Sequence, residues 1–237
     1  MQLGGLPVED DVAAGVWISS ARRRAETGTL AALLPDTFEA YARVLHPAVR
    51  YAGDDDIEVH WAEVAAHNGT TAHPLMQWHA ITRGPVECQP PVWDDGPSQG
   101  HLPVAVAVRL SRVLARHTRT PDDCLFGRCD GFGYDLLDPE TPPRLLMRGG
   151  NDVVLVRGRV ADAIRNLAPE PHEQSANLWW PADHAWCVVT DLDLRSTYVG
   201  GSAACVAELL VTPGLETVPA SPGDRVAVDP VNPVPRG

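Results

Sequence analysis

Helix-like spacing of apolar residues occurs mainly in the first half of the chain, and strand-like patterns occur mainly in the second half. The spacing predicts helices over 33–47, from the acids at 54–56 to 68–69, over 103–117, and shorter ones over 160–167 and 202–211. It predicts strands over 124–128, 144–147, 153–156, 186–194 and 215–218. Because regular β-α alternation is missing, we expect an α+β fold, with a mixed or antiparallel sheet and helices packed mainly on one face.

The segment 33–47 carries the clearest helix signals. Asp36 can act as an N-cap, Glu39 follows three residues later as in a capping box, and Pro47 prevents the helix from continuing. Four apolar residues repeat at helical spacing: Phe38, Tyr41, Val44 and Leu45. The pattern therefore predicts an amphipathic helix.

The length and composition suit one globular domain. With 237 residues, 44% of them hydrophobic, the chain can bury a substantial core, and we expect a single α+β domain over 1–220. Prolines recur in 221–237, so this tail is expected to be poorly ordered. No apolar run is long enough to span a bilayer, and the start carries acids rather than the basic residues of a signal peptide. A cytoplasmic location is therefore expected.

The charge balance restricts both partners and chemistry. The chain has 19 basic and 31 acidic residues, and the net charge of −12 disfavours nucleic acid and anionic membranes as partners. Every basic residue is an arginine, and the absence of lysine excludes Schiff-base enzymes, pyridoxal phosphate enzymes with their own lysine and P-loop NTPases. The five cysteines are odd in number and scattered, so free thiols are expected.

Several motifs that identify a metal or dinucleotide site are missing. The chain has no H-E-x-x-H, no C-x-x-C and no G-x-G-x-x-G. Histidines recur at intervals of six or seven residues, at His60, His67, His73 and His79. This spacing matches no ligand pattern, so we expect them at the surface or at the edge of the core. No catalytic residue, cofactor or metal ligand is assigned.

An arginine stripe is the first candidate binding surface. The set consists of Arg109, Arg112, Arg116 and Arg119, whose successive offsets along the sequence are three, four and three positions. This spacing places them along one side of a helix, opposite its apolar stripe. The stripe could bind a carboxylate-rich or phosphate-bearing partner, or it could be a solvated face that pairs with the chain's own acids.

A pair of aspartates is the second candidate. Asp191 and Asp193 are two residues apart in the predicted strand 186–194, so their carboxylates would lie about 7 Å apart on one face. This separation suits metal binding or acid-base catalysis. The alternative is a pair of solvated side chains.

Two further segments are candidates for binding. Trp179 and Trp180 point to opposite sides of an extended chain, so one could pack in the core while the other faces a cleft or a partner, with Asp183 in the same segment. Gly200-Gly201 precede Ser202, which can act as the N-cap of the predicted helix 202–211. The N–H groups exposed there could hold an anion, or the three residues could simply form a tight turn and a cap.

Two resemblances to known families follow from these residues. The runs at 179–183, 190–194 and 197–202 resemble segments of an uncharacterised bacterial protein family with no assigned activity, which implies no catalytic residues. The run Leu33-Leu-Pro-Asp-Thr-Phe-Glu-Ala-Tyr41 is similar to the start of SUKH domains. Those domains are α+β interaction modules, many of them immunity proteins against toxins.

The sequence favours a non-catalytic binding or protein-interaction module, because catalytic signatures are weak or missing while aromatic and arginine surfaces remain available. Another protein is the expected partner. The alternative is a metal-dependent, hydrolase-like enzyme that uses Asp191 and Asp193 together with a histidine.

Overall fold

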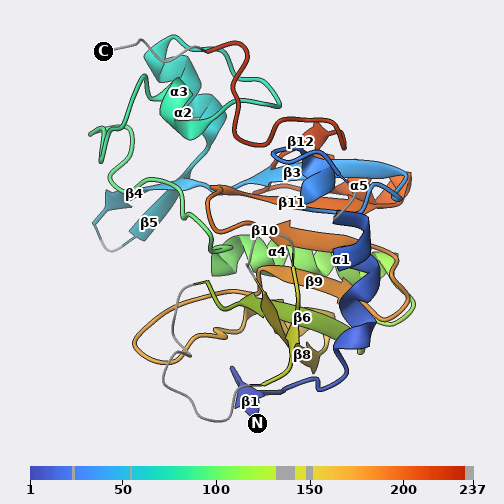
Figure 1. The fold of residues 1–237 in the computed structure, drawn as a ribbon. Helices are drawn as coiled ribbons and strands as arrows, with labels where there is room; N and C mark the ends of the chain where they lie inside the picture. Colours follow the sequence, from blue (N-terminus) through green and yellow to red (C-terminus); the bar gives the residue numbers. More distant parts are fainter. Residues whose placement is uncertain (23–24, 54, 132–141, 148–151, 233–237) are drawn as a thin grey trace.

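The fold is built around one antiparallel sheet. The computed structural model describes residues 1–22, 25–53, 55–131, 142–147 and 152–232. In this part of the chain eight strands follow the order β12-β3-β11-β10-β9-β6-β8-β7, and all neighbouring strands are antiparallel (Figure 1). The strands are β3 (Ala40–Leu45), β6 (Cys124–Cys129), β7 (Arg144–Leu145), β8 (Val153–Gly158), β9 (Leu178–Pro181), β10 (Cys187–Thr190), β11 (Ser196–Gly201) and β12 (Glu216–Ala220). The predicted α+β class with an antiparallel sheet is confirmed.

Helices cover the two faces of this sheet unequally. The longer ones, α4 (Val104–Leu114) and α5 (Ala203–Leu210), share one face with the 3₁₀ turns η3 (Ala115–His117) and η4 (Val160–Ile164). The other face carries α1 (Val16–Arg22) with η1 (Val12–Gly15) and η2 (Leu30–Ala32) (Figure 1). Successive strand residues point to opposite faces, so Ala42 and Val44 of β3 lie under α4 and α5, whereas Tyr41 lies under α1.

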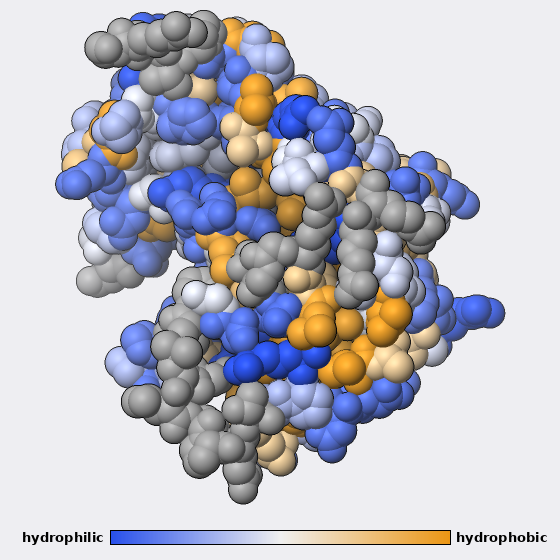
Figure 2. Space-filling view, in the orientation of Figure 1, coloured by the Kyte–Doolittle hydropathy of each residue, from blue (hydrophilic) through white to orange (hydrophobic). Residues whose placement is uncertain are grey.

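The N-terminal hairpin lies against the edge of the main sheet, and a hydrophobic surface area lies near α1. The hairpin of β1 (Gln2–Leu3) and β2 (Leu6–Pro7) leads to a bridge between Val8 and Val156 of β8. Figure 2 shows hydrophobic residues gathered on the surface over and beside α1, where Val16 is 47% exposed. No described helix has the length and apolar character needed to cross a bilayer.

A third apolar core lies beside the main sheet. A hairpin of β4 (Ala48–Ala52) and β5 (Asp55–Val59) leads into α2 (Trp61–Asn68), and α3 (Trp78–Ile81) packs against α2 (Figure 1). Three tryptophans form the centre of this core: the ring centroids of Trp61 and Trp78 are 5.4 Å apart, and those of Trp78 and Trp93 are 5.2 Å apart. Because β4 begins at Ala48, shortly after β3 ends at Leu45, this core lies next to that end of the sheet.

The predicted helix over 33–47 is wrong, because residues Ala40–Leu45 form β3 between β11 and β12. A strand buried on both faces is apolar along most of its length, so its residues also satisfy a helical spacing. Glu39 does not cap a helix of its own segment. Its carboxylate instead accepts a hydrogen bond from the backbone N of Ala203, at 2.9 Å.

Most of the other predicted elements are present, although not always with the predicted bounds. The second helix begins only at Trp61, because the residues before it pair in β5, and it ends at Gly69 with a left-handed φ of 62°. The helix expected over 103–117 is confirmed as α4 followed by η3. Strands therefore also occur early in the chain, and the expected grouping of helices before strands is wrong.

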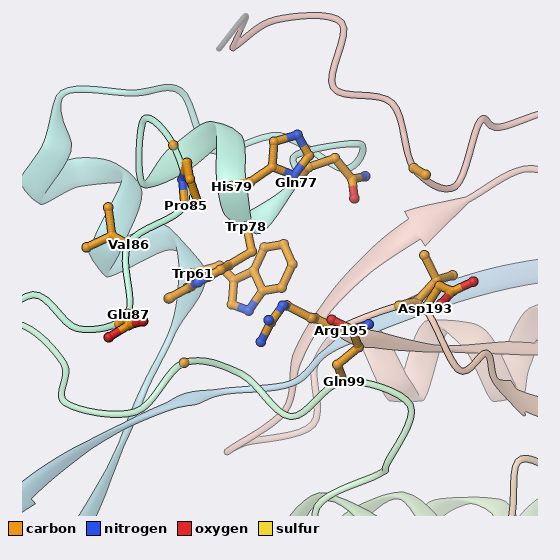
Figure 3. A pocket seen from close by; sticks show the side chains of 14 residues that line it. Trp61, Gln77, Trp78, His79, Pro85, Val86, Glu87, Gln99, Asp193 and Arg195 are labelled. Atoms are coloured by element: carbon orange, nitrogen blue, oxygen red, sulfur yellow. The ribbon is translucent and has the colours of Figure 1, made fainter. Parts of the chain in front are cut away.

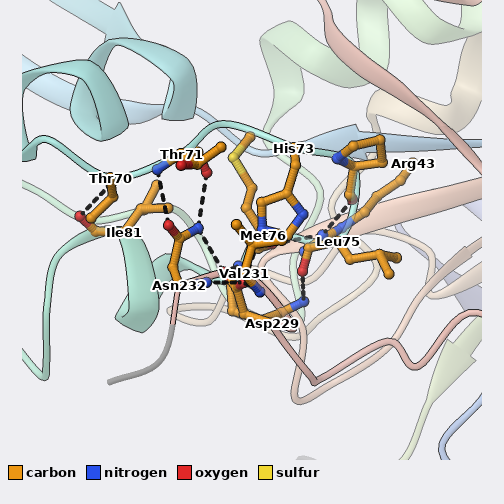
Figure 4. A network of polar contacts seen from close by, with 12 residues as sticks. Arg43, Thr70, Thr71, His73, Leu75, Met76, Ile81, Asp229, Val231 and Asn232 are labelled. Carbon is orange, nitrogen blue, oxygen red and sulfur yellow. Dashed lines mark hydrogen bonds and ion pairs between the residues drawn. The ribbon is translucent and has the colours of Figure 1, made fainter. Parts of the chain in front are cut away.

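The tail expected to be poorly ordered is attached over most of its length. Val226 is 7% exposed and packs in the core under α1. Asp229 and Asn232 hydrogen-bond to the loop that precedes α3 (Figure 4). The expectation of poor order is therefore wrong for residues 221–232, and residues 233–237 lie outside the described part of the chain.

Candidate functional site

A pocket of about 610 Å³ lies between the third core and the turn that joins β10 to β11. Figure 3 shows Trp61 and Trp78 on one side, Arg195 and Asp193 on the other, and Glu87 at one edge. The size lies within the range of small-molecule sites. The site is therefore assembled from two distant parts of the chain, one from Trp61 to Gln99 and the other from Asp193 to Ala227.

The aromatic wall is held by hydrogen bonds to its indole groups. Nε1 of Trp61 donates to the carbonyl of His46 at 2.7 Å, and Nε1 of Trp93 donates to Oε1 of Gln89 at 3.2 Å. Nε1 of Trp78 has no hydrogen-bond partner among the described residues, and Figure 3 shows this indole directed into the pocket. The pocket therefore contains an indole donor that is free to bind a ligand.

Arg195 forms the opposite wall and has no acidic partner. Its NH1 group donates to the carbonyl of Pro97, and no carboxylate oxygen of the described residues lies within 4.0 Å of its guanidinium. By contrast, Arg109 pairs with Glu58 at 2.8 Å. Burial lowers the pKa of Arg195 from its ordinary value, although a guanidinium stays charged at neutral pH.

Gly96 lies between the two walls. A Cβ on Gly96 would lie 3.6 Å from Nε1 of Trp78 and 3.7 Å from NH1 of Arg195, which are ordinary contact distances. One point in space is thus close to both donors. Because residue 96 has no side chain, nothing from this position projects between the indole and the guanidinium.

His46 connects both walls from behind. Its backbone N donates to the carbonyl of Arg195 at 3.2 Å, and its carbonyl accepts from Trp61. The buried ring bonds the carbonyl of Ser98 through Nδ1 at 2.8 Å and the hydroxyl of Thr197 through Nε2 at 2.9 Å. Because a carbonyl only accepts, Nδ1 carries the proton and Nε2 accepts from Thr197. Burial, the largest cause, lowers the pKa of His46 to about 4, so the ring is neutral at pH 7.

The C-terminal segment fixes the loop that carries Gln77 into the pocket. The carboxylate of Asp229 accepts from the backbone N of Gln77 at 3.1 Å and bonds Nε2 of His73 at 2.9 Å (Figure 4). Asn232 and Thr71 exchange two hydrogen bonds, each of 2.9 Å. Ala227 of the same segment lines the pocket. The end of the described chain is therefore part of the site.

Arg43 supports the same loop from the sheet side. Its NH1 group donates to the carbonyls of Pro74 at 3.1 Å and Met76 at 2.8 Å. Its guanidinium carbon lies 5.4 Å from the ring centroid of Trp61 and 5.8 Å from that of Tyr198, which is a cation–π arrangement. This side chain is 2% exposed, so it holds the loop rather than a ligand.

Both predicted tryptophans of β9 are core residues. Trp179 and Trp180 point to opposite faces as expected, but they are 1% and 0% exposed, so neither faces a cleft or a partner. Asp183 accepts from the hydroxyl of Thr118 and from the backbone N of Arg119, both at 2.8 Å. Burial alone would raise the pKa of Asp183, but these hydrogen bonds lower it overall. All three side chains are therefore engaged in contacts within the chain.

Asp191 and Asp193 do not share a strand face. Strand β10 ends at Thr190, and the backbone N of Asp193 donates to Oδ1 of Asp191 at 3.0 Å in the turn that follows. Asp193 lines the pocket beside Arg195, whereas Asp191 lines a separate, small pocket with Arg22. The predicted strand is confirmed over Cys187–Thr190 but ends before the two aspartates, so their predicted placement on one strand face is wrong.

The glycine pair and the serine also differ from the prediction. Gly200 and Gly201 are the last residues of β11 rather than a tight turn, and a Cβ on Gly200 would lie 2.5 Å from the Phe38 ring. Ser202 is the N-cap, as predicted, and its hydroxyl accepts from the backbone N of Cys205 at 3.2 Å. The carboxylate of Glu39 already occupies the helix N-terminus, which is the predicted alternative position for an anion.

The arginine stripe is paired mainly with the chain's own acids. Arg109 bonds Glu58, and Arg116 bonds Glu208. Arg119 lies beyond η3, 3.8 Å from a carboxylate oxygen of Asp183. Arg112 is exposed and has no carboxylate within 4.0 Å among the described residues. The stripe therefore resembles the solvated alternative more than a continuous binding surface.

The four histidines of the early segment do not converge. His73 bonds Asp229, and His79 lies at the edge of the pocket. Among the described residues no group of three or more histidine, cysteine, aspartate or glutamate side chains is arranged to hold a metal ion. The five cysteines are free, and all except Cys88 are buried.

A G-x-S-x-G pattern occurs at 96–100, beside the pocket. In hydrolases this pattern places a serine on a strand-to-helix turn beside a base. Here it lies in a loop after an isolated bridge at Asp95, and the His46 ring bonds the carbonyl of Ser98 rather than its hydroxyl. Among the described residues, no histidine or carboxylate forms a hydrogen bond with the Ser98 hydroxyl.

Of the candidates expected from the sequence, only Asp193 lines this pocket. Sequence reasoning missed Trp78, Gly96 and Arg195. The feature of the sequence that could have pointed to this site is the aromatic and glycine content of the early loops. Comparisons of the chain with protein-family models, with curated proteins and with solved structures find no match.

Proposed function

We propose that this protein is a non-catalytic binding module whose ligand occupies the pocket between Trp78 and Arg195. The observation that carries the proposal is the guanidinium of Arg195, which lines the pocket without a carboxylate within 4.0 Å among the described residues. The chain has a net charge of −12, so acids to pair with this cation are abundant. A cation that none of them neutralises is available to a ligand.

The chemistry of the lining supports binding rather than catalysis. The described residues that line the pocket include no serine, threonine, cysteine or tyrosine. The remaining candidates for proton transfer are His79, Glu87 and Asp193, and no hydrogen bond or ion pair joins His79 to either acid in the described structure. A nucleophile paired with an oriented base, which covalent catalysis needs, is therefore not assembled here.

A pair of glycine variants tests the proposal. Gly96→Leu places a side chain between the two walls, and its first carbon meets only ordinary contacts. Gly223→Leu is the matched control, since nothing lies within 4 Å of a Cβ there. Both glycines have φ values that other residues adopt. The two variants thus differ in whether the added side chain enters the pocket.

The measurement is a thermal-shift screen of a small-molecule library. Compounds that raise the Tm of the native chain are expected to raise that of Gly223→Leu equally and that of Gly96→Leu much less, because a ligand stabilises only the state that binds it. If every stabilising compound acts equally on all three proteins, the pocket is not the ligand site and the proposal fails.

A further inference from the structure

We infer that the ligand of this pocket is a small, flat monocarboxylate whose carboxylate binds between Arg195 and the indole N–H of Trp78. The inference rests on the proposed function and adds the chemical class of the ligand. It follows from the donors in the pocket, from the apolar surface beside them and from the charges at the pocket edge.

The two donors can act on one carboxylate. A Cβ built on Gly96 would lie 3.6 Å from Nε1 of Trp78 and 3.7 Å from NH1 of Arg195, so the two groups are close enough together for one carboxylate in front of Gly96 to reach both. NH1 uses one of its two N–H groups for the carbonyl of Pro97, so its second N–H and the other donors of the guanidinium remain for a ligand. A carboxylate has two acceptor oxygens, and hydrogen bonds from a guanidinium to a carboxylate are stronger than neutral ones. The pairing therefore satisfies donors that the described chain leaves open.

The surroundings favour a flat apolar body next to the carboxylate. Trp61, Trp78, Pro85, Val86 and Leu194 contribute to the lining. Figure 3 shows the Trp78 ring beside Arg195, so a planar group attached to the carboxylate would contact the indole. Contacts between aromatic rings contribute more binding free energy than the burial of their apolar surface alone would give.

The charges at the edge disfavour ligands with more than one negative charge. Glu87 and Asp193 line the same pocket, and both are exposed. A phosphate or a dicarboxylate would bring a second negative charge near these two acids, with only Arg195 to compensate. Because like charges repel, a second negative charge beside these two carboxylates disfavours phosphate relative to a single carboxylate.

Matched probes separate the carboxylate from the body that carries it. Indole-3-acetate and its neutral amide, indole-3-acetamide, have the same ring and nearly the same size. Their binding is followed by the ¹H–¹⁵N signals of the tryptophan indole groups, with the Trp78 signal assigned by its loss in Trp78→Phe. Inorganic phosphate is the third probe.

The expected result is a shift of the Trp78 indole signal and a Kd for the acid about tenfold or more below that of the amide. In Arg195→Gln the two probes should bind equally, whereas Arg112→Gln should keep the native preference. Arg112 is the control because it is an exposed arginine, also without a nearby carboxylate, on α4. Arg195→Lys, which keeps the charge, should keep part of the preference and serves if Arg195→Gln does not fold.

Three results would overturn the inference. The acid and the amide could bind the native chain equally, phosphate could displace the acid at similar concentrations, or neither probe could shift the Trp78 signal. The proposed function is judged separately by the glycine variants. It stands if Gly96→Leu blocks some other class of compound, and it fails only if no binder is sensitive to that substitution.

Discussion

His46 makes the stability of this protein depend on pH in a way that one substitution can reveal. The ring is buried and neutral, with Nδ1 donating to Ser98 and Nε2 accepting from Thr197. In the unfolded chain the same ring has its ordinary pKa of 6.5, whereas burial lowers the pKa to about 4 in the folded protein. The perturbation is His46→Gln, which removes the titrating group but keeps a side chain that can hydrogen-bond.

The magnitude follows from the difference between the two pKa values. Between these values the unfolded state binds more protons than the folded state, so the free energy of unfolding falls as the pH is lowered. The shift in the pKa of His46 to about 4 implies a loss of about 2 kcal/mol between pH 7 and pH 4.5. Below the folded pKa the loss stops growing. Neighbouring His101, Arg43 and Arg195 also disfavour the charged ring.

The assay is urea unfolding, followed by tryptophan fluorescence, across this pH range. At pH 7 the native chain should be more stable than His46→Gln, and this difference should shrink by about 2 kcal/mol by pH 4.5. The two proteins share all other ionisable groups, so the contributions of those groups largely cancel in the difference. Parallel pH curves for the two proteins would refute the account of a buried, neutral His46.

Three further predictions concern packing, the tail and metals. Gly200→Ala should lower the free energy of unfolding by about 1–3 kcal/mol, since its Cβ would lie 2.5 Å from Phe38; an unchanged Tm would contradict this. Asp229→Ala should cost about 2 kcal/mol and expose 221–232 to limited proteolysis, because buried donors lose their acceptor; an unaltered cleavage pattern would argue against the attachment. Divalent cations should leave the Tm unchanged; a rise that Asp191→Asn abolishes would support the hydrolase alternative.

Elements with local signals were the predictable part of the fold. α4 has an amphipathic pattern that its own residues define, and Gly69 and Ser202 terminate or cap their helices through contacts within a few residues. β3 was not predictable in this way, because a strand with two buried faces has no simple alternation of apolar and polar residues. It pairs with β11 and β12, whose residues lie more than 150 positions later in the sequence, so no local pattern could reveal the pairing.

The pocket was not predictable for the same reason. The register of β3 and β11 places Ser196 opposite Leu45, which brings Arg195 beside His46 and the tryptophans that follow it. Nothing in the spacing of Arg195 distinguishes it from other arginines. Arg109 and Arg116 had a regular spacing that suggested a surface, yet the fold supplies both with acidic partners. Local patterns thus identified charged residues, and tertiary pairing decided which of them remained available.

The most direct test of the account is a crystal structure of the protein soaked with indole-3-acetate. We expect density for the ring beside Trp78 and for the carboxylate against Arg195, with no carboxylate of the chain within 4.0 Å of that guanidinium before soaking. If Arg195 is instead paired with Glu87 or Asp193, and the pocket holds no ligand, the cation is not available and the central claim is contradicted.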